Sequence, residues 1–143
     1  MGEGAPASSS SCEIRIGNQL SEIERVADLV DEFGARHQLA NEVIVAVNVS
    51  LDEVINNIIS YGYDDAAEHE ILVRLDLRGP QIEIVVEDDA RAFDPLSVGP
   101  PDLSSPDRIG GVGLHFIRNL MDRLEYARQD GVNQLRLTKK LGA

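Results

Sequence analysis

A glutamate and an asparagine one helical turn apart are the first side chains with a spacing suited to chemistry. Glu53 and Asn57 lie at positions i and i+4 of LDEVINNIISYGY, and residues with this spacing share one face of a helix. A carboxylate at Glu53 can accept a proton from water or a hydroxyl group, and the Asn57 amide oxygen suits a Mg²⁺ ion held mainly by phosphates. On its own, the pair is also typical of a polar helix face that points to water.

A second candidate is an aspartate at the end of an apolar strand pattern. Asp88 directly follows QIEIVVE, in which apolar and polar residues alternate. A carboxylate there can accept a hydrogen bond from an amino group such as that of adenine. Asp89 competes for the same role, and an aspartate that only forms a turn gives the same pattern.

A third candidate is the glycine-rich segment Gly110-Gly111-Val112-Gly113-Leu114, which runs directly into a helical pattern. Glycines allow the backbone to approach phosphates closely, and the free N–H groups and dipole of a helix N-terminus attract anions. An acidic protein could therefore still bind a triphosphate through backbone amides and Mg²⁺. The same glycines would also suit a flexible start of a helix.

The elements that position these residues follow from periodicity and turn signals. A strand is expected over residues 12–16, followed by a helix capped by Ser21 and Glu24 and ending near Gly34. A second helix begins near Ala40 or Asn41 and ends at Gly62. The pattern then predicts strands over 70–77 and 81–87, a long loop over 88–108, a helix from residue 110, and strands over 124–128 and 133–141 joined by an Asp130-Gly131 turn. This order predicts an α+β two-layer sandwich.

Composition limits the class of protein. The 143 residues fit one domain, expected over 12–143 after a disordered leader at 1–11, and the net charge of −12 disfavours direct nucleic-acid binding. No apolar run reaches the length of a membrane span and no signal peptide is visible. The single cysteine, with no zinc-type Cys/His spacing, is typical of a reducing cytoplasm.

In their order along the chain, the three candidate sites resemble the motifs of the GHKL ATPases, and among these the small anti-sigma-factor serine/threonine protein kinases. DEVINNIISYGY is similar to their N-box, VVEDDARAFDP to their first glycine box, GGVGLHFIRNLMD to their second, and YARQDGVNQLRLTKKL to their closing hairpin. The resemblance covers nearly all residues after the leader. It implies a Bergerat-type ATP-binding fold with a mixed, mostly antiparallel sheet covered on one face by about three helices.

The resemblance also implies roles for individual residues. Glu53 would be the catalytic base, Asn57 the Mg²⁺ ligand and Asp88 the residue that reads adenine. The ATP-binding set further contains the two alanines of the first box, an arginine beside the second box, and the second box itself: Ala90, Ala92, Arg108, Gly110, Gly111, Val112, Gly113 and Leu114. The first box departs from the family pattern, because Ala90 and Ala92 replace glycines. Alanine disfavours a positive φ, which would weaken nucleotide binding if the backbone required one.

The resemblance implies an enzyme that also acts as a binding switch. It would transfer the γ-phosphoryl group of ATP to a small anti-sigma-factor antagonist, and it would hold an RNA-polymerase sigma factor inactive, as a homodimer. A non-catalytic, nucleotide-gated binding module is the alternative that the two alanines suggest. The catalytic half of a histidine kinase is disfavoured because no phosphoacceptor histidine domain fits in this length, and a gyrase-like or mismatch-repair ATPase would need further domains.

Overall fold

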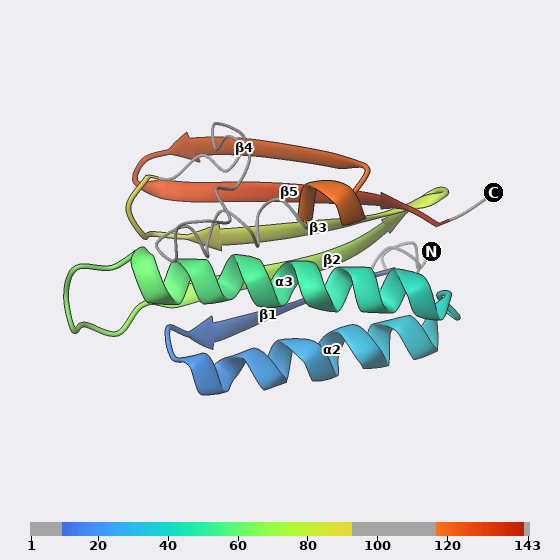
Figure 1. The fold of residues 1–143 in the computed structure, drawn as a ribbon, viewed down its shortest axis with the longest axis horizontal. Helices are drawn as coiled ribbons and strands as arrows, with labels where there is room; N and C mark the ends of the chain where they lie inside the picture. The colour runs from blue at the N-terminus through green and yellow to red at the C-terminus, as the bar shows by residue number, and fades with distance from the viewer. Residues whose placement is uncertain (1–9, 93–116, 142–143) are drawn as a thin grey trace, which may run out of the picture.

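A computed structural model of the protein describes residues 10–92 and 117–141. These residues form β1 (Ser11–Gly17), the 3-10 turn η1 (Leu20–Glu22), α2 (Ile23–Arg36), α3 (Asn41–Tyr61), β2 (Glu70–Arg78), β3 (Gln81–Asp88), β4 (Arg123–Gln129) and β5 (Val132–Lys140). A further helical turn spans 117–120 and leads to β4. The two long helices run side by side along one face of the sheet (Figure 1). The predicted α+β two-layer architecture is therefore confirmed.

The sheet has five strands in the order β1-β2-β3-β5-β4. Every neighbouring pair is antiparallel, so the described sheet is fully antiparallel rather than mixed. The register of β3 and β5 places Asp88 opposite Asn133. The last described strand, β5, therefore lies inside the sheet and reaches the end of β3 that carries the candidate aspartate.

Alternation along the strands separates a buried face from an open one. The face under the helices is mainly apolar and packs against Val47, Leu51 and Ile55 of α3. The opposite face carries charged side chains around the buried Leu72 and Val85, and there Arg136 donates a hydrogen bond to Glu83 at 3.0 Å. Antiparallel sheets commonly cover one face and leave the other to solvent, which explains this division.

The start of α2 differs from the sequence prediction. No side chain caps the helix, which begins after η1, so the predicted capping box of Ser21 and Glu24 does not form. Glu22 instead accepts a hydrogen bond from the Gly17 N–H at 2.9 Å and so holds the turn out of β1. Gly34 lies two residues before the helix ends at Arg36, so the end predicted near Gly34 is confirmed. This glycine lies where α2 meets α3, and a Cβ atom on it would approach Ile44 to 2.6 Å.

The second helix matches its prediction at both ends. Helix α3 covers 41–61, Gly62 follows it, and the buried stripe includes Val43, Val47, Leu51 and Val54. Its length and a mean hydropathy of 1.4 would allow it to cross a membrane, and it is the only described helix that meets both criteria. Its buried stripe packs in the core against the sheet, as in the central helix of a soluble domain.

The predicted Asp130-Gly131 turn is confirmed, and a second tight turn joins β2 to β3. Gly79 joins β2 to β3 with a φ of +61°, and Asp130 and Gly131 join β4 to β5 with φ values of +54° and +80°. Consecutive positive φ angles are those of the type I′ turn, for which Asp-Gly is a preferred pair. Leu124 belongs to β4 and not to the preceding helix.

Candidate functional site

Glu53 and Asn57 lie one turn apart on α3, as the sequence predicts, and both are partly exposed. The pKa of Glu53 is raised, first because burial disfavours its charged form and second because the Asp52 carboxylate lies nearby. A carboxylate with a raised pKa is a better proton acceptor at neutral pH than an ordinary surface glutamate. The geometry is therefore compatible with a general base at this position.

The Asn57 amide has unused hydrogen-bonding capacity. Its Nδ2 atom is buried and has no hydrogen-bond partner within the described part of the chain. Buried polar groups are nearly always hydrogen-bonded. The unpaired Nδ2 of Asn57, one turn from the candidate base, could therefore donate its missing hydrogen bond to a bound ligand. Among residues 10–92 and 117–141, no three His, Cys, Asp or Glu side chains are arranged to hold a metal ion. A Mg²⁺ ion bound at Asn57 would therefore need the phosphates of a nucleotide as its main ligands.

Asp88 lies at the end of β3 with only 7% of its surface exposed. Its Oδ1 atom accepts hydrogen bonds from the backbone N–H of Ala90 and from Nδ2 of Asn133, both at 2.9 Å. No described residue donates a hydrogen bond to its Oδ2 atom. Burial raises the pKa of Asp88, and the hydrogen bonds from Asn133 and Ala90 oppose this shift. The carboxylate is thus fixed in position, and with respect to residues 10–92 and 117–141 its Oδ2 atom can still accept a hydrogen bond from a ligand.

The two alanines of the first box have an ordinary backbone. Among the described non-glycine residues, only Gln38 and Asp130 have a positive φ, so neither Ala90 nor Ala92 is strained. Ala90 is buried and packs against Gly62, where an added Cβ would lie 2.7 Å from the Ala90 methyl group. The Arg91 N–H donates to the Gly62 carbonyl at 2.9 Å. The absent side chain of Gly62 thus makes room for the methyl group of Ala90.

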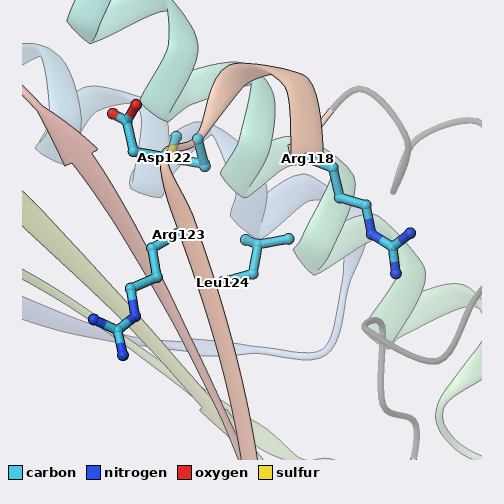
Figure 2. Close-up of a pocket in the computed structure, with 5 residues that line it drawn as sticks. Arg118, Asp122, Arg123 and Leu124 are labelled. Atoms are coloured by element: carbon cyan, nitrogen blue, oxygen red, sulfur yellow. The ribbon is translucent and has the colours of Figure 1, made fainter.

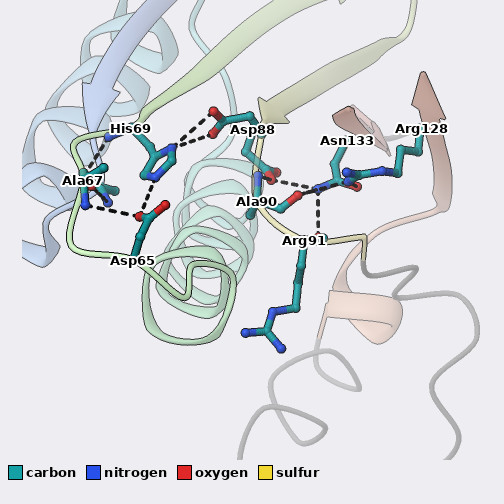
Figure 3. Close-up of polar contacts among 10 residues, drawn as sticks. Asp65, Ala67, His69, Asp88, Ala90, Arg91, Arg128 and Asn133 are labelled. Atoms are coloured by element: carbon teal, nitrogen blue, oxygen red, sulfur yellow. Dashed lines mark hydrogen bonds and ion pairs between the residues drawn. The ribbon is translucent and has the colours of Figure 1, made fainter. Parts of the chain in front are cut away.

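The loop between α3 and β2 is tied to this end of β3. Nε2 of His69 lies 2.9 Å from Asp65, and its Nδ1 lies 3.2 Å from both oxygens of Asp89. The ring stacks on Tyr63 with centroids 4.1 Å apart, and Arg91 forms an ion pair with Asp64. Figure 3 shows His69 and Asp65 on one side of the site and Asn133 with Arg128 on the other.

Three polar residues of the C-terminal hairpin complete the site and were not predicted. Asn133 contacts Asp88, and Tyr126 and Arg128 contact Asn133. The sequence pattern that could have predicted Asn133 is the alternation of β5, in which Asn133 occupies an inward position in line with Leu135 and Leu137. A polar residue at such a core position needs a partner, and here the partner is Asp88.

The remaining predicted site residues lie outside the described residues. These are the arginine and the glycine-rich segment: Arg108, Gly110, Gly111, Val112, Gly113 and Leu114. Their assignment to phosphate binding stays a prediction. Glu53, Asn57, Asp88, Ala90 and Ala92 are all described, and Ala92 is exposed.

A separate surface pocket lies where the helical turn at 117–120 leads into β4 (Figure 2). It is lined by Arg118, Met121, Asp122, Arg123 and Leu124. Asp122 already accepts a hydrogen bond from the Lys140 N–H at 2.7 Å. None of the predicted site residues lines this pocket, so it is distinct from the candidate site.

Comparison with known proteins identifies relatives of this arrangement. The family described as the histidine kinase-like ATPase domain matches residues 16–139. The serine/threonine-protein kinase BtrW of Bordetella bronchiseptica is 31% identical over 114 residues, which cover 76% of this chain and 79% of that protein. The serine-protein kinase RsbW of Listeria monocytogenes is 27% identical and covers 71% of this chain and 69% of that protein.

Solved structures agree on the fold. The crystal structure of the RsbU and RsbW domains of a Mycobacterium tuberculosis protein superposes with a TM-score of 0.68 at 17% identity. The match covers 92% of this chain, which spans about a third, 32%, of that longer chain. The sequence and structure matches together show that this chain belongs to the histidine kinase-like ATPase domain family, the GHKL group of ATP-binding folds.

Proposed function

We propose that this chain is an ATP-dependent serine/threonine protein kinase. The observation that carries the proposal is the buried Asp88 carboxylate, fixed by two hydrogen bonds at 2.9 Å and with Oδ2 available, in a chain whose relatives are named serine kinases. An adenine amino group is a donor that would satisfy this oxygen. Because neither alanine of the first box needs a positive φ, their replacement of glycine puts no strain on the backbone of the site.

The residues of α3 suit phosphoryl transfer to a hydroxyl group. Bound ATP would supply the phosphoryl group, and Mg²⁺ would neutralise charge on its phosphates. Glu53 accepts the proton of the substrate hydroxyl as that oxygen bonds to the γ-phosphorus and the bond to the ADP leaving group breaks. Asn57, one turn further along the same helix face, orients the phosphates through its unpaired amide. The raised pKa of Glu53 favours this proton transfer near neutral pH.

The proposed partners follow from the resemblance to the anti-sigma-factor kinases. The phosphorylated substrate is a small antagonist protein, and the second partner is an RNA-polymerase sigma factor that the kinase holds inactive. A net charge of −12 favours partners with basic contact surfaces. The proposed active form is a cytoplasmic homodimer.

The test compares two acids on α3. Glu53→Gln removes the proposed base, and Glu42→Gln makes the same change at an exposed position near the start of the helix. Calorimetric titration with ATP and Mg²⁺ measures binding, and mass spectrometry measures phosphoserine on a purified candidate antagonist. We expect both variants to bind ATP, and Glu53→Gln alone to lose transfer by about a hundredfold or more.

Two results would contradict the proposed kinase mechanism. Full transfer by Glu53→Gln would remove Glu53 from the mechanism. ATP binding by the wild type without phosphoserine on any antagonist that binds it would instead favour the nucleotide-gated binding module.

A further inference from the structure

We propose that Asn133 is a positioning residue that acts through Asp88 to make the site selective for adenine, whose 6-amino group donates a hydrogen bond, over guanine, which carries the acceptor O6 at the same place. The inference rests on the proposed nucleotide site and extends it to a residue of the C-terminal hairpin. Asn133 itself has no assigned role in nucleotide binding. Asn133 lies on β5, between two neighbouring strands. Its cross-strand partners are Asp88 of β3 on one side and Arg128 of β4 on the other.

The Asn133 amide nitrogen connects to the end of β3 at three points. The two hydrogens of Nδ2 serve three acceptors, so one of them is shared: Asp88 Oδ1 lies at 2.9 Å, and the carbonyl oxygens of Ala90 and Arg91 both lie at 3.1 Å. The Asn133 side chain therefore fixes both the carboxylate and the two peptide groups that follow it in the chain. With 5% of Asn133 and 7% of Asp88 exposed, water competes little for these hydrogen bonds.

The orientation of the amide is determined by its neighbours. Its Oδ1 atom accepts hydrogen bonds from the Tyr126 hydroxyl and from Nη1 of Arg128, the latter at 2.8 Å. Arginine can only donate, and an ionised carboxylate and a carbonyl oxygen can only accept. A flipped amide would place its oxygen against three acceptors and its NH₂ group against the arginine. Only one orientation satisfies both sides, and in it Nδ2 points to Asp88 (Figure 3).

This arrangement determines what Asp88 can recognise. The donors on Oδ1, from Asn133 and Ala90, stabilise the ionised form against the effect of burial. Oδ2 then acts as an acceptor, which suits the amino group of adenine and repels the O6 oxygen of guanine. Without the Asn133 donor, only the Ala90 N–H would hold Asp88 Oδ1, so the orientation of the carboxylate and its preference for a donor would both weaken. Selectivity for adenine therefore depends on Asp88 and Asn133 together.

The experiment uses Asn133→Asp, which keeps the shape of the side chain and replaces the NH₂ group by an acceptor. At about pH 8 we expect the Kd for ATP to rise about tenfold or more and the Kd for GTP to change little, so that the preference for ATP falls. Two carboxyl groups this close hold a shared proton when the pH is lowered. At about pH 6 the introduced carboxyl can therefore donate to Asp88, and part of the ATP affinity should return. A residue with only a structural role would not produce this pH profile.

The register offers a matched control. Gln134 and Glu87 form the next cross-strand pair on the same two strands, and Nε2 of Gln134 donates to Glu87 at 2.7 Å on the open face. Gln134→Glu therefore makes the same amide-to-acid change beside a carboxylate, away from the site. We expect its Kd values for ATP and GTP to stay within about twofold of the wild type.

A second variant decides the question if Asn133→Asp does not fold. Arg128 is exposed, and Arg128→Met removes the donor that orients Asn133 together with a 3.0 Å hydrogen bond to the Ala90 carbonyl. Arg123→Met, on the same strand, is its control. We expect weaker ATP binding and a reduced preference over GTP in Arg128→Met only.

Three outcomes separate this inference from the proposed function. If the wild type does not bind ATP, the proposed site itself is wrong. If the wild type binds ATP and a folded Asn133→Asp has the same Kd values for ATP and GTP, the role of Asn133 is overturned. If Asn133→Asp is unfolded, unchanged binding in Arg128→Met overturns it in the same way.

Discussion

Replacing Gly62 by alanine tests how the end of α3 supports the first box. A Cβ atom at this position would lie 2.5 Å from the carbonyl oxygen of Ile58 and 2.7 Å from the methyl group of Ala90. Normal contacts of this kind are about 3.5–4.0 Å, so one of the neighbours must move by about 1 Å. Neither is the end of a flexible side chain, and the Arg91 N–H to Gly62 carbonyl hydrogen bond at 2.9 Å holds the two segments together.

The expected magnitude follows from two opposing terms. Overpacking of this kind costs about 1–3 kcal/mol, and replacing a glycine in an ordinary helical conformation recovers about 0.4–1 kcal/mol through the unfolded chain. We expect Gly62→Ala to lower the free energy of unfolding by about 1–2 kcal/mol, which lowers Tm by about 3–7 °C in a domain of this size. Displacement of Ala90 should also disturb Asp88 and raise the Kd for ATP by about tenfold.

The matched control is Gly34→Ala, a second helical glycine with a close neighbour. There the new Cβ would lie 2.6 Å from Cδ1 and 2.7 Å from Cγ1 of Ile44, so a partly buried side chain must shift, whereas at Gly62 a backbone carbonyl must move. Alanine inside α2 also gains about 1 kcal/mol of helix propensity. Gly34→Ala should therefore change Tm less than Gly62→Ala and leave the Kd for ATP unchanged.

A double-mutant cycle completes the test. Ala90→Gly removes the methyl group that Gly62→Ala would strike, so the double variant should recover part of the lost stability and ATP affinity. Thermal unfolding and calorimetric titration of the wild type, the two single variants and the double variant give the coupling energies between positions 62 and 90 for stability and for ATP binding. Equal Tm losses in Gly62→Ala and Gly34→Ala, or no coupling between positions 62 and 90, would refute the steric reasoning.

The remaining predictions concern charged groups of the site and of the open sheet face. Hydrogen bonds to Asp65 and then to Asp89 raise the pKa of His69, so its stabilising effect is complete below about pH 6.5 and is lost as the pH rises through the raised value. The Tm difference between the wild type and His69→Gln should therefore shrink with increasing pH, and a constant difference would contradict this. Because burial raises the pKa of Asp88, the ionised form costs stability at neutral pH, and Asp88→Asn should keep or raise Tm while calorimetry shows loss of ATP binding. Arg136→Met should cost about 1 kcal/mol in chemical denaturation, because Arg136 is 37% exposed and Glu83 keeps a second ion pair with Arg78 at 3.6 Å, and a much larger loss would show that the open face is energetically important.

Local patterns were enough to predict the elements that carry the main site residues. Helix α3 was predicted because its apolar stripe and Gly62 agree, and β3 was predicted because QIEIVVE alternates. The prediction of Glu53, Asn57 and Asp88 as site residues needed only their positions within these two elements. The predicted cap of α2 was wrong because Glu22 binds the Gly17 N–H, an interaction that depends on how β1 turns into the helix.

The interactions that the sequence did not reveal are long-range. Asn133 meets Asp88 only because β5 pairs with β3 in one register, across 45 positions of the chain. The pairing of His69 with Asp89 likewise joins the ends of two elements, and Asp64 and Asp65 alone have the composition of an ordinary solvated turn. Sequence periodicity specifies which face of a strand is buried, but it does not specify which residue of another strand lies opposite.

The interior place of β5 has a consequence for how the protein is made. A ribosome delivers β1, α2, α3, β2 and β3 before it delivers the strand that must fit between β3 and β4. Until β5 has emerged, Asp88 lacks the Asn133 hydrogen bond and β3 has an unpaired edge, which is a hazard for association between nascent chains. The nucleotide site would therefore form late in synthesis, in the single step in which β5 joins the sheet. A nascent chain interrupted before residue 132 would contain Glu53 and Asp88 but would lack the strand that completes the site.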